Sequence, residues 1–107
     1  MPDKLMQKLP EGFRELTLVQ ERMTLGRSLD SDLVVEDRSV SRAHARFERV
    51  GGVWTVADLR SRNGTRVNEM ALEAEKPFPI KDGDAVTCGT VRLDFLRDEM
   101  EKLEFSQ

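Results

Sequence analysis

The sequence predicts an all-β sandwich formed by a single domain. About ten short segments with apolar alternation or β-branched residues recur along the chain, and turn signals rich in Gly, Asn, Asp and Pro separate them every few residues. No alternation of strand-like and helix-like segments appears, which disfavours an α/β fold. With 107 residues, the chain is long enough to bury one core without disulfides or metals.

The start of the chain is expected to lie outside the sandwich. Residues 1–11 show neither clear strand nor clear turn chemistry, so we expect a flexible N-terminal arm there. Apolar and polar residues alternate over 13–20, which predicts the first strand. After a tight connection at Glu21-Arg22, residues 23–25 are expected to return as the partner of that strand. Gly26 then ends the segment at a point where another backbone could approach closely.

Two hairpins are indicated further along. Gly51-Gly52 separates a strand over 43–50 from a return strand over 53–57, the spacing of a two-residue turn. Gly89-Thr90 separates the last two strands, whose expected inward residues are Val86, Cys88, Leu93 and Phe95. Cys88, in this apolar strand, is expected to be a buried small hydrophobic residue.

The remaining segments complete the expected domain. Phe78 lies between Pro77 and Pro79, and because proline cannot donate to a sheet ladder, this segment predicts an edge strand. Residues 12–97 are therefore expected to form the domain. Residues 98–107 place Met100 and Leu103 at roughly helical spacing, which indicates a short helical tail or a linker.

The charge is distributed unevenly. The formal net charge is −3, which argues against a general nucleic-acid binder. Residues 38–66 nevertheless contain seven arginines against Glu48 and Asp58, a segment charge of +5 that leaves −8 for the rest of the chain. Such a local basic patch suits a compact anion bound at one place, although ordinary solvated arginines explain Arg46 and Arg49 equally well.

Several protein classes are disfavoured by composition. No segment approaches the ~20 consecutive apolar residues of a membrane helix, and the N-terminus lacks the apolar core of a signal peptide. One cysteine and one histidine cannot make an internal disulfide and are too few for a structural zinc site. We therefore expect a cytoplasmic protein without metal, cofactor or membrane partner.

Anion binding is the chemistry that the polar residues favour. Phosphate groups are best met by guanidinium forks, hydroxyls and backbone N–H groups, which Arg27, Ser41, Arg42 and the Arg62-Asn63 turn supply. Catalysis by Ser41 and His44 is disfavoured, because residues three apart on a strand point to opposite faces and a nucleophile needs contact with its base. His44 is instead expected to hold its loop by hydrogen bonds to nearby backbone.

The order of these motifs resembles one known family. Gly26-Arg27, Ser41-Arg42-Ala43-His44, Asn63-Gly64-Thr65 and Asn68 follow one another as in the forkhead-associated (FHA) domain family. The intervening segments 32–35 and 58–61 and the later 82–86 are similar to that pattern as well. The resemblance covers roughly residues 16–96, most of the chain, and the combined motifs are highly specific.

The resemblance implies an FHA-type (SMAD/FHA-like) sandwich of eleven strands in two antiparallel or mixed sheets, with loops at one end that bind phosphothreonine. It implies that Arg27 and Ser41 contact the phosphate and that Arg42 adds a second basic contact. Asn63 would hydrogen-bond the peptide backbone. The residues that would shape and support the loops are Gly26, His44, Gly64, Thr65 and Asn68.

Arg62 departs from the threonine or serine often found just before the Asn-Gly pair of the family. An arginine at this position could contact the phosphate, contact an acidic residue of the peptide, or point to solvent. Solvent exposure is slightly favoured, and we keep Arg62 among the candidate peptide-binding residues.

The sequence therefore predicts a non-enzymatic module that binds phosphothreonine in a partner protein, or in a phosphorylated segment of its own parent chain, downstream of a Ser/Thr protein kinase. A second hypothesis is a phosphate-independent module for protein interaction or oligomerisation on the same fold. Neither hypothesis involves nucleic acid.

Overall fold

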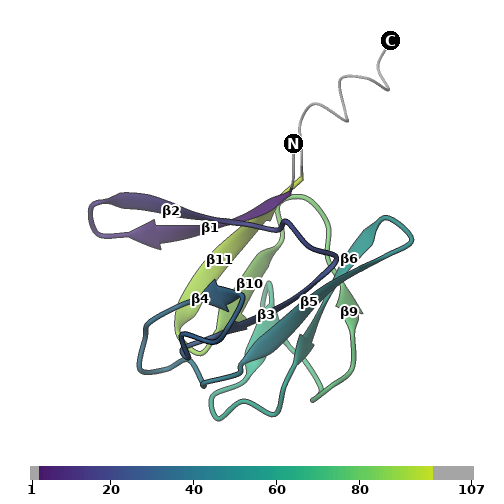
Figure 1. Ribbon diagram of the computed structural model, residues 1–107. Helices are drawn as coiled ribbons and strands as arrows, with labels where there is room; N and C mark the ends of the chain where they lie inside the picture. Colours follow the sequence, from purple (N-terminus) through teal and green to yellow (C-terminus); the bar gives the residue numbers. More distant parts are fainter. Residues whose placement is uncertain (1–2, 98–107) are drawn as a thin grey trace.

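The computed structural model of the protein describes residues 3–97, which form eleven β-strands in two sheets (Figure 1). No helix in this part of the chain is long and apolar enough to cross a membrane. The strands are β1 (Lys4–Leu9), β2 (Gly12–Thr17), β3 (Arg22–Gly26), β4 (Leu33–Val34), β5 (Ala45–Val50), β6 (Val53–Asp58), β7 (Thr65–Val67), β8 (Met70–Ala71), β9 (Phe78–Pro79), β10 (Ala85–Cys88) and β11 (Val91–Leu96).

The two sheets form the expected sandwich. One has six strands in the order β2-β1-β11-β10-β7-β8, and the other has five in the order β4-β3-β5-β6-β9. The ladders between these strands are antiparallel except for the parallel pair β3–β4, so the second sheet is mixed. The predicted all-β fold with eleven strands in two sheets is confirmed.

A single apolar core fills the space between the sheets. Inward residues from both sheets are fully buried because the side chains of each strand alternate between the core and the outer face. The predicted inward residues of the last two strands, Val86, Cys88, Leu93 and Phe95, each have 0% exposure.

The expected flexible arm is wrong over residues 4–9, which form β1. This strand lies between β2 and β11, and its Leu5 is fully buried in the core. The ladder pairs Lys4 with Leu96, so β1 finds one of its partners near the other end of the described chain. The pairing with β11 leaves no local signal, whereas the pairing with β2 runs through a turn at Pro10-Glu11 that was not recognised in the sequence.

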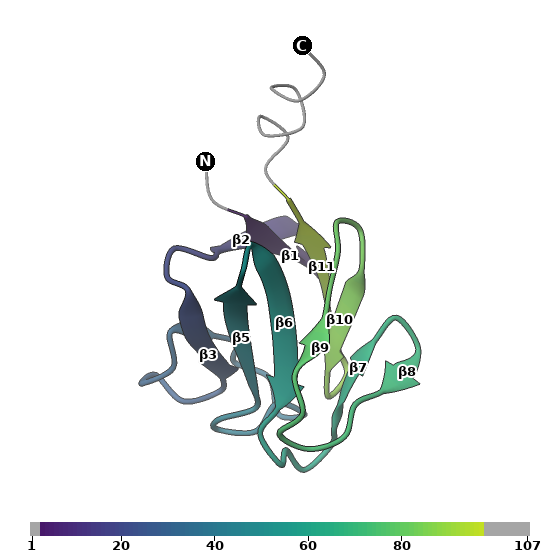
Figure 2. The same ribbon diagram turned by 90° about the vertical axis from the view of Figure 1, so that its right-hand side faces the viewer.

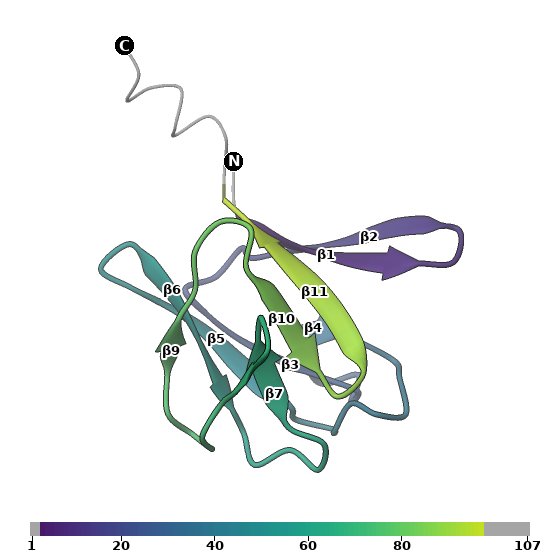
Figure 3. The same cartoon turned by 180° about the vertical axis from the view of Figure 1, so that it is seen from behind.

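The partner expected for β2 is also wrong. β2 pairs with β1, whereas β3 pairs with β4 and β5 in the other sheet. Residues 18–21 carry the chain from one sheet to the other, and the Leu18 N–H donates to the Asp3 carbonyl over 2.9 Å. The β1–β2 hairpin extends to one side of the sandwich (Figures 1 and 3). Phe13 of β2 is 65% exposed.

The other predicted hairpins are confirmed. β5 and β6 are joined by Gly51 and Gly52, whose φ angles of 58° and 79° match the left-handed conformation that a tight hairpin turn requires. β10 and β11 pair about Gly89-Thr90. β9 pairs only with β6 at the edge of its sheet, as the flanking prolines predict.

The two ends of the sandwich differ. The start of β1 and the end of β11 lie together at one end, and the loop between β6 and β7 lies at the opposite end (Figure 2). Near the first of these ends, the Trp54 Nε1–H donates to the Asp3 carboxylate over 2.8 Å, and Arg97 forms an ion pair with the same carboxylate. The predicted helical tail over 98–107 lies outside the described residues.

Candidate functional site

Three loops meet at the end of the sandwich opposite the start of β1: the β3–β4 loop, the β4–β5 loop and the β6–β7 loop (Figure 2). Backbone hydrogen bonds join the first two. The Arg27 N–H donates to the Ser41 carbonyl over 2.9 Å, and the Ser28 N–H donates to the Arg42 carbonyl over 3.3 Å. The polar residues of separate sequence motifs are therefore held side by side by the backbone itself.

Gly26 makes this close approach possible. A Cβ atom at this position would lie 1.9 Å from the Arg42 carbonyl oxygen and 2.7 Å from the Arg42 carbonyl carbon, which no real side chain tolerates. The sequence-based expectation of a close backbone approach at Gly26 is confirmed. The glycine is required for space, since its φ angle is not in the left-handed region.

The loops enclose one small pocket, here called the loop pocket. Its volume is about 10 Å³, far below the roughly 300–1,000 Å³ typical of small-molecule sites. It therefore suits one compact group and not a whole metabolite. Its lining residues are Arg27, Arg38, Ser39, Val40, Ser41, Arg62 and Asn63.

Arg27 is held against the wall of the loop pocket. Its Nε donates to the Val40 carbonyl over 2.9 Å. Within residues 3–97 its two terminal nitrogens have no partner, and the residue is exposed. One edge of the guanidinium is thus fixed by the protein, and the remaining N–H groups are available to an anion.

The Ser41 hydroxyl is oriented by the neighbouring loop. Its oxygen accepts a hydrogen bond from the backbone N–H of Arg62 over 3.0 Å. A hydroxyl has one proton and two lone pairs. Because a lone pair takes the Arg62 contact, the Ser41 proton can be donated to a bound anion.

His44 is fully buried and connects two loops through backbone atoms. Its Nδ1 accepts from the Ser41 N–H over 3.0 Å, so Nδ1 carries no proton and Nε2 donates to the Gly64 carbonyl over 2.9 Å. The expected hydrogen bonds from His44 to nearby backbone are confirmed. That expectation assumed that Ser41 and His44 lie on one strand. The assumption is wrong, because residues 41–43 form a loop.

Asn63 links the β6–β7 loop to the β4–β5 loop. Its side-chain Nδ2 donates to the Ser39 carbonyl over 2.9 Å. Gly64 follows with a φ of 84°, a conformation that favours glycine. The second Nδ2 proton and the Oδ1 atom of Asn63 remain available for a ligand backbone, since an amide can make several hydrogen bonds.

A buried carboxylate anchors the base of the β6–β7 loop. The Asp58 side chain accepts from the Thr65 hydroxyl over 2.7 Å, and also from the Ser61 hydroxyl and the Ser61 N–H. The Ser61 hydroxyl in turn accepts from the Gly64 N–H over 2.9 Å. This network fixes the loop that presents Asn63, and Thr65 belongs to it as a fully buried member.

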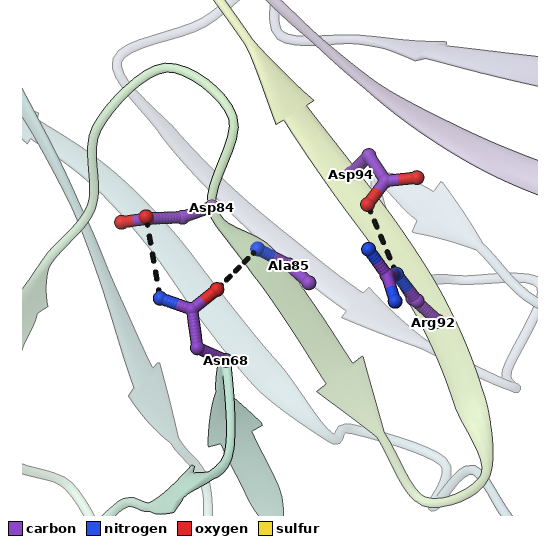
Figure 4. Close-up of polar contacts among 5 residues, drawn as sticks. All are labelled: Asn68, Asp84, Ala85, Arg92 and Asp94. Atoms are coloured by element: carbon purple, nitrogen blue, oxygen red, sulfur yellow. Dashed lines mark hydrogen bonds and ion pairs between the residues drawn. The ribbon is translucent and has the colours of Figure 1, made fainter.

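Asn68 acts at the other end of β7. Its φ is 57°, its Oδ1 accepts from the Ala85 N–H over 3.1 Å, and its Nδ2 donates to the Asp84 carboxylate over 3.3 Å. Figure 4 shows these contacts between the end of β7 and the start of β10, beside the Arg92–Asp94 pair on β11. Asn68 does not line the loop pocket. Its contacts instead fix β7, the strand from which the β6–β7 loop extends.

Arg42 is placed differently from the other candidates. It is exposed and does not line the loop pocket. Its carbonyl oxygen accepts hydrogen bonds from the Ser31 hydroxyl over 3.2 Å and from the Ser28 N–H. A ligand contact by the Arg42 guanidinium remains a prediction.

Two residues of the loop pocket, Arg38 and Ser39, were not assigned to the site from the sequence. Arg38 and Ser39 both lie in a turn that is closed by a hydrogen bond from the Val40 N–H to the Asp37 carbonyl over 3.0 Å. The Asp37 carboxylate accepts from the hydroxyl and the N–H of Ser39, and these bonds lower the pKa of Asp37. The sequence signal that could have identified these two residues is an Asp-x-Ser turn within the arginine-rich segment.

The chain is similar to several known proteins. It is 36% identical over 97 residues to the oxoglutarate dehydrogenase inhibitor of Corynebacterium jeikeium, covering 91% of this chain and 65% of that protein. It is also 36% identical over 92 residues to the glycogen accumulation regulator GarA of Mycolicibacterium smegmatis, covering 86% of this chain and 56% of that protein. The chain thus spans somewhat less than two thirds of the length of these relatives.

A solved FHA domain, described in connection with phosphothreonine-dependent FHA domain interactions, superposes with a TM-score of 0.80. It is 28% identical and covers 92% of this chain and 98% of the solved chain. The FHA domain family model matches residues 23–89, the segment that contains all three loops of the candidate site. On the fold, the loop geometry and this match, the chain belongs to the FHA domain family.

Proposed function

We propose that this chain is a phosphothreonine-dependent protein-interaction module whose ligand phosphate binds in the loop pocket. The observation that carries the proposal is the convergence of Arg27, Ser41 and Asn63 on one small pocket from three separate loops. A guanidinium, a hydroxyl proton and an amide are each left with hydrogen-bonding capacity toward the ligand.

The chemistry of the pocket matches a phosphate monoester. A phosphothreonine carries about −1.5 to −2 charges at neutral pH and three strong acceptor oxygens. Arg27 and Ser41 supply charged and neutral donors for these oxygens, and the terminal atoms of Asn63 can bond the peptide backbone. The donors are fixed by protein hydrogen bonds before the ligand arrives, which reduces the entropy lost on binding.

The partner would be a protein phosphorylated by a Ser/Thr kinase, or a phosphorylated segment of the parent chain itself, in the cytoplasm. The regulatory names of the relatives and the phosphothreonine-dependent interactions of the solved FHA domain support such a role. The partner's residues around the phosphothreonine would determine which phosphorylated protein binds.

A catalytic role is disfavoured by the geometry of Ser41 and His44. The His44 ring contacts the backbone N–H of Ser41, whereas the Ser41 hydroxyl contacts the Arg62 N–H. Both ring nitrogens of His44 are already engaged with backbone atoms. The imidazole is therefore in no position to act as a base toward this hydroxyl.

The proposal is tested by isothermal titration with an oriented phosphothreonine peptide library and with its dephosphorylated counterpart. Each charge-assisted hydrogen bond contributes roughly 1.5–3 kcal/mol, so Arg27→Ala should weaken phosphopeptide binding about tenfold to a hundredfold. Arg49→Ala, an exposed arginine of β5 outside the loop pocket, is the matched control and should bind normally.

Binding that survives dephosphorylation and the Arg27→Ala substitution would contradict the proposal. That result would favour the phosphate-independent interaction or oligomerisation module. Sedimentation of the wild-type protein would then separate self-association from binding to another protein.

A further inference from the structure

Ser39 is the residue at which three segments of the protein meet. Its backbone N–H and its hydroxyl both donate to the Asp37 carboxylate, over 2.9 and 2.7 Å. Its hydroxyl oxygen accepts from the Thr90 N–H over 2.9 Å, and the Thr90 hydroxyl oxygen lies 2.9 Å from the same atom. Its carbonyl accepts from the Asn63 side chain over 2.9 Å. One small residue therefore joins the β4–β5 loop, the β6–β7 loop and the turn between β10 and β11.

The Ser39 hydroxyl has no hydrogen-bonding capacity left for a ligand. A hydroxyl has one proton and two lone pairs. The proton goes to Asp37, because an ionised carboxylate can only accept, and the bonds from the Ser39 hydroxyl and N–H lower the pKa of that carboxyl. The two lone pairs then take the N–H and the hydroxyl proton of Thr90. Ser39 lines the loop pocket, yet its hydroxyl is bound entirely by the protein.

The carbonyl of Ser39 is also packed against Gly89. A Cβ atom on Gly89 would lie 2.3 Å from the Ser39 carbonyl oxygen and 2.8 Å from its carbonyl carbon, so only glycine lets the β10–β11 turn lie this close. The φ of 63° at Gly89 favours glycine as well. Its N–H donates to the Gly64 carbonyl over 3.1 Å, which joins the turn to the β6–β7 loop. Figure 3 shows this turn at the end of the sandwich where the loops lie.

The β10–β11 turn can influence a ligand in the loop pocket through Asn63. Neither Gly89 nor Thr90 lines that pocket. The Asn63 amide has two Nδ2 protons, and the bond to the Ser39 carbonyl takes one of them. That bond sets the direction of the other proton and of Oδ1. A displaced Ser39 carbonyl would therefore turn the amide away from its present orientation.

We propose that Ser39 and Thr90 are positioning residues for ligand binding and that the β10–β11 turn is a fourth element of the site. The turn holds the Ser39 carbonyl where it orients the Asn63 amide toward the peptide backbone of a phosphothreonine ligand. The side chains of Ser39 and Thr90 do this without contacting the ligand. This inference rests on the proposed function and adds to it a contribution from a turn outside the loop pocket.

The first test removes one hydrogen bond from this network. Thr90→Val replaces the hydroxyl by a methyl group of similar size and keeps the N–H bond to Ser39. Fluorescence polarisation with one phosphothreonine peptide, selected from the oriented library, should show binding about threefold to tenfold weaker than wild type. Thr90→Ser restores the hydroxyl and should bind like wild type.

Thr87→Val is the matched control. It makes the same chemical change on β10, where the Thr87 side chain makes no hydrogen bond within residues 3–97 and does not line the loop pocket. Its affinity for the peptide should equal that of the wild type. All variants are compared well below their unfolding temperatures, so that each is folded during the titration.

A double-mutant cycle with Asn63 separates positioning from a general structural effect. Asn63→Ala removes the amide through which Thr90 is proposed to act. In that background, Thr90→Val should weaken binding by less than about a further 1.5-fold. A merely structural role would give the same loss with and without the Asn63 amide.

The Asn63 side chain also provides a readout in the free protein. Two-dimensional NMR of isotope-labelled protein detects the side-chain amide of Asn63 directly. Its signal should move in Thr90→Val and stay close to the wild-type position in Thr90→Ser and in Thr87→Val.

The outcomes separate the inference from the proposed function. Unchanged peptide affinity or an unmoved Asn63 signal in Thr90→Val overturns the inference and leaves the proposed function intact. An equal loss in the Asn63→Ala background also overturns it. If the wild type binds no phosphothreonine peptide, the proposed function itself is wrong. The Asn63 signal in the free protein then decides the inference: a shift in Thr90→Val supports the positioning of this amide, and no shift overturns it.

Discussion

Gly26 shows how one residue can decide whether the loops meet. The atoms nearest to an added Cβ belong to the Arg42 backbone, which cannot turn aside as a flexible side chain can. We expect Gly26→Ala to destabilise the protein by about 1–3 kcal/mol, the usual cost of overpacking, and to weaken phosphopeptide binding as Arg27 is displaced. Urea unfolding followed by Trp54 fluorescence measures the first effect, and unchanged stability would contradict this explanation.

Cys88 has a strongly raised pKa. Burial, with a smaller contribution from the Asp58 carboxylate, raises the pKa of the Cys88 thiol from 9.0 to about 12, against a lowering contribution from the Thr65 hydroxyl. The neutral thiol is therefore favoured in the folded protein. We expect iodoacetamide at pH 8 to leave native Cys88 unmodified and to alkylate it after unfolding in urea.

The same shift links stability to alkaline pH. Because the pKa is raised in the folded state, the contribution of Cys88 is fully present below pH 9.0 and is lost as the pH rises toward about 12. Cys88→Val provides the control, since its stability should fall less steeply over this range. Equal slopes for the two proteins would show that the Cys88 thiol does not take part.

At the scale of elements, Asn68 determines how β7 lies against β10. Asn68→Ala removes the acceptor for the Ala85 N–H and places alanine at a φ of 57°. We expect a loss of about 2–3 kcal/mol in the free energy of unfolding. Asn68→Gly removes the same hydrogen bonds but tolerates the backbone conformation, so it should lie between alanine and wild type in thermal unfolding. A glycine variant less stable than the alanine variant would contradict this assignment.

The elements also show where local patterns suffice. The β5–β6 and β10–β11 hairpins were predicted because a two-residue turn brings neighbouring strands together without help from the rest of the chain. The pairing of β2 with β3 was predicted on the same reasoning and is wrong. Residues 18–21 cross between sheets, and nothing in their local sequence distinguishes such a crossing from a turn within one sheet.

At the scale of the whole molecule, Asp3 connects the two sheets at one end of the sandwich, because its partners belong to β6 of one sheet and to the residue after β11 of the other. It is 5% exposed, accepts from the Trp54 indole, and pairs with Arg97. We expect Asp3→Ala to cost about 3 kcal/mol, because a buried indole N–H loses its acceptor and a partly buried arginine loses its counter-charge. Asp3→Asn retains an acceptor and should cost less, and differential scanning calorimetry compares the two.

Binding provides the control for that prediction. Asp3 lies at the end of the sandwich opposite the three loops, so Asp3→Asn should bind phosphopeptide with unchanged affinity while it remains folded. A loss of affinity well below the unfolding temperature would mean that the two ends of the molecule are coupled.

Much of the loop pocket could be anticipated from residue types and order. Arg27, Ser41, Arg62 and Asn63 were predicted as a group, and all four line the pocket. Arg42 was included as the second basic contact that the family resemblance implies; it does not line the pocket, and its contact with a ligand stays a prediction. Arg38 was left out because only the turn at Asp37 brings it to the pocket.

The sequence by itself determined the all-β class, the short-range hairpins and the family, because each depends on local alternation, turn residues or the order of motifs. Only the tertiary structure decided that β1 completes the first sheet, that Gly26 lies against the Arg42 carbonyl, and that three arginines share one pocket. These features join residues far apart in the chain. Their cause is close packing of backbone against backbone in three dimensions, which leaves no periodic pattern in the sequence.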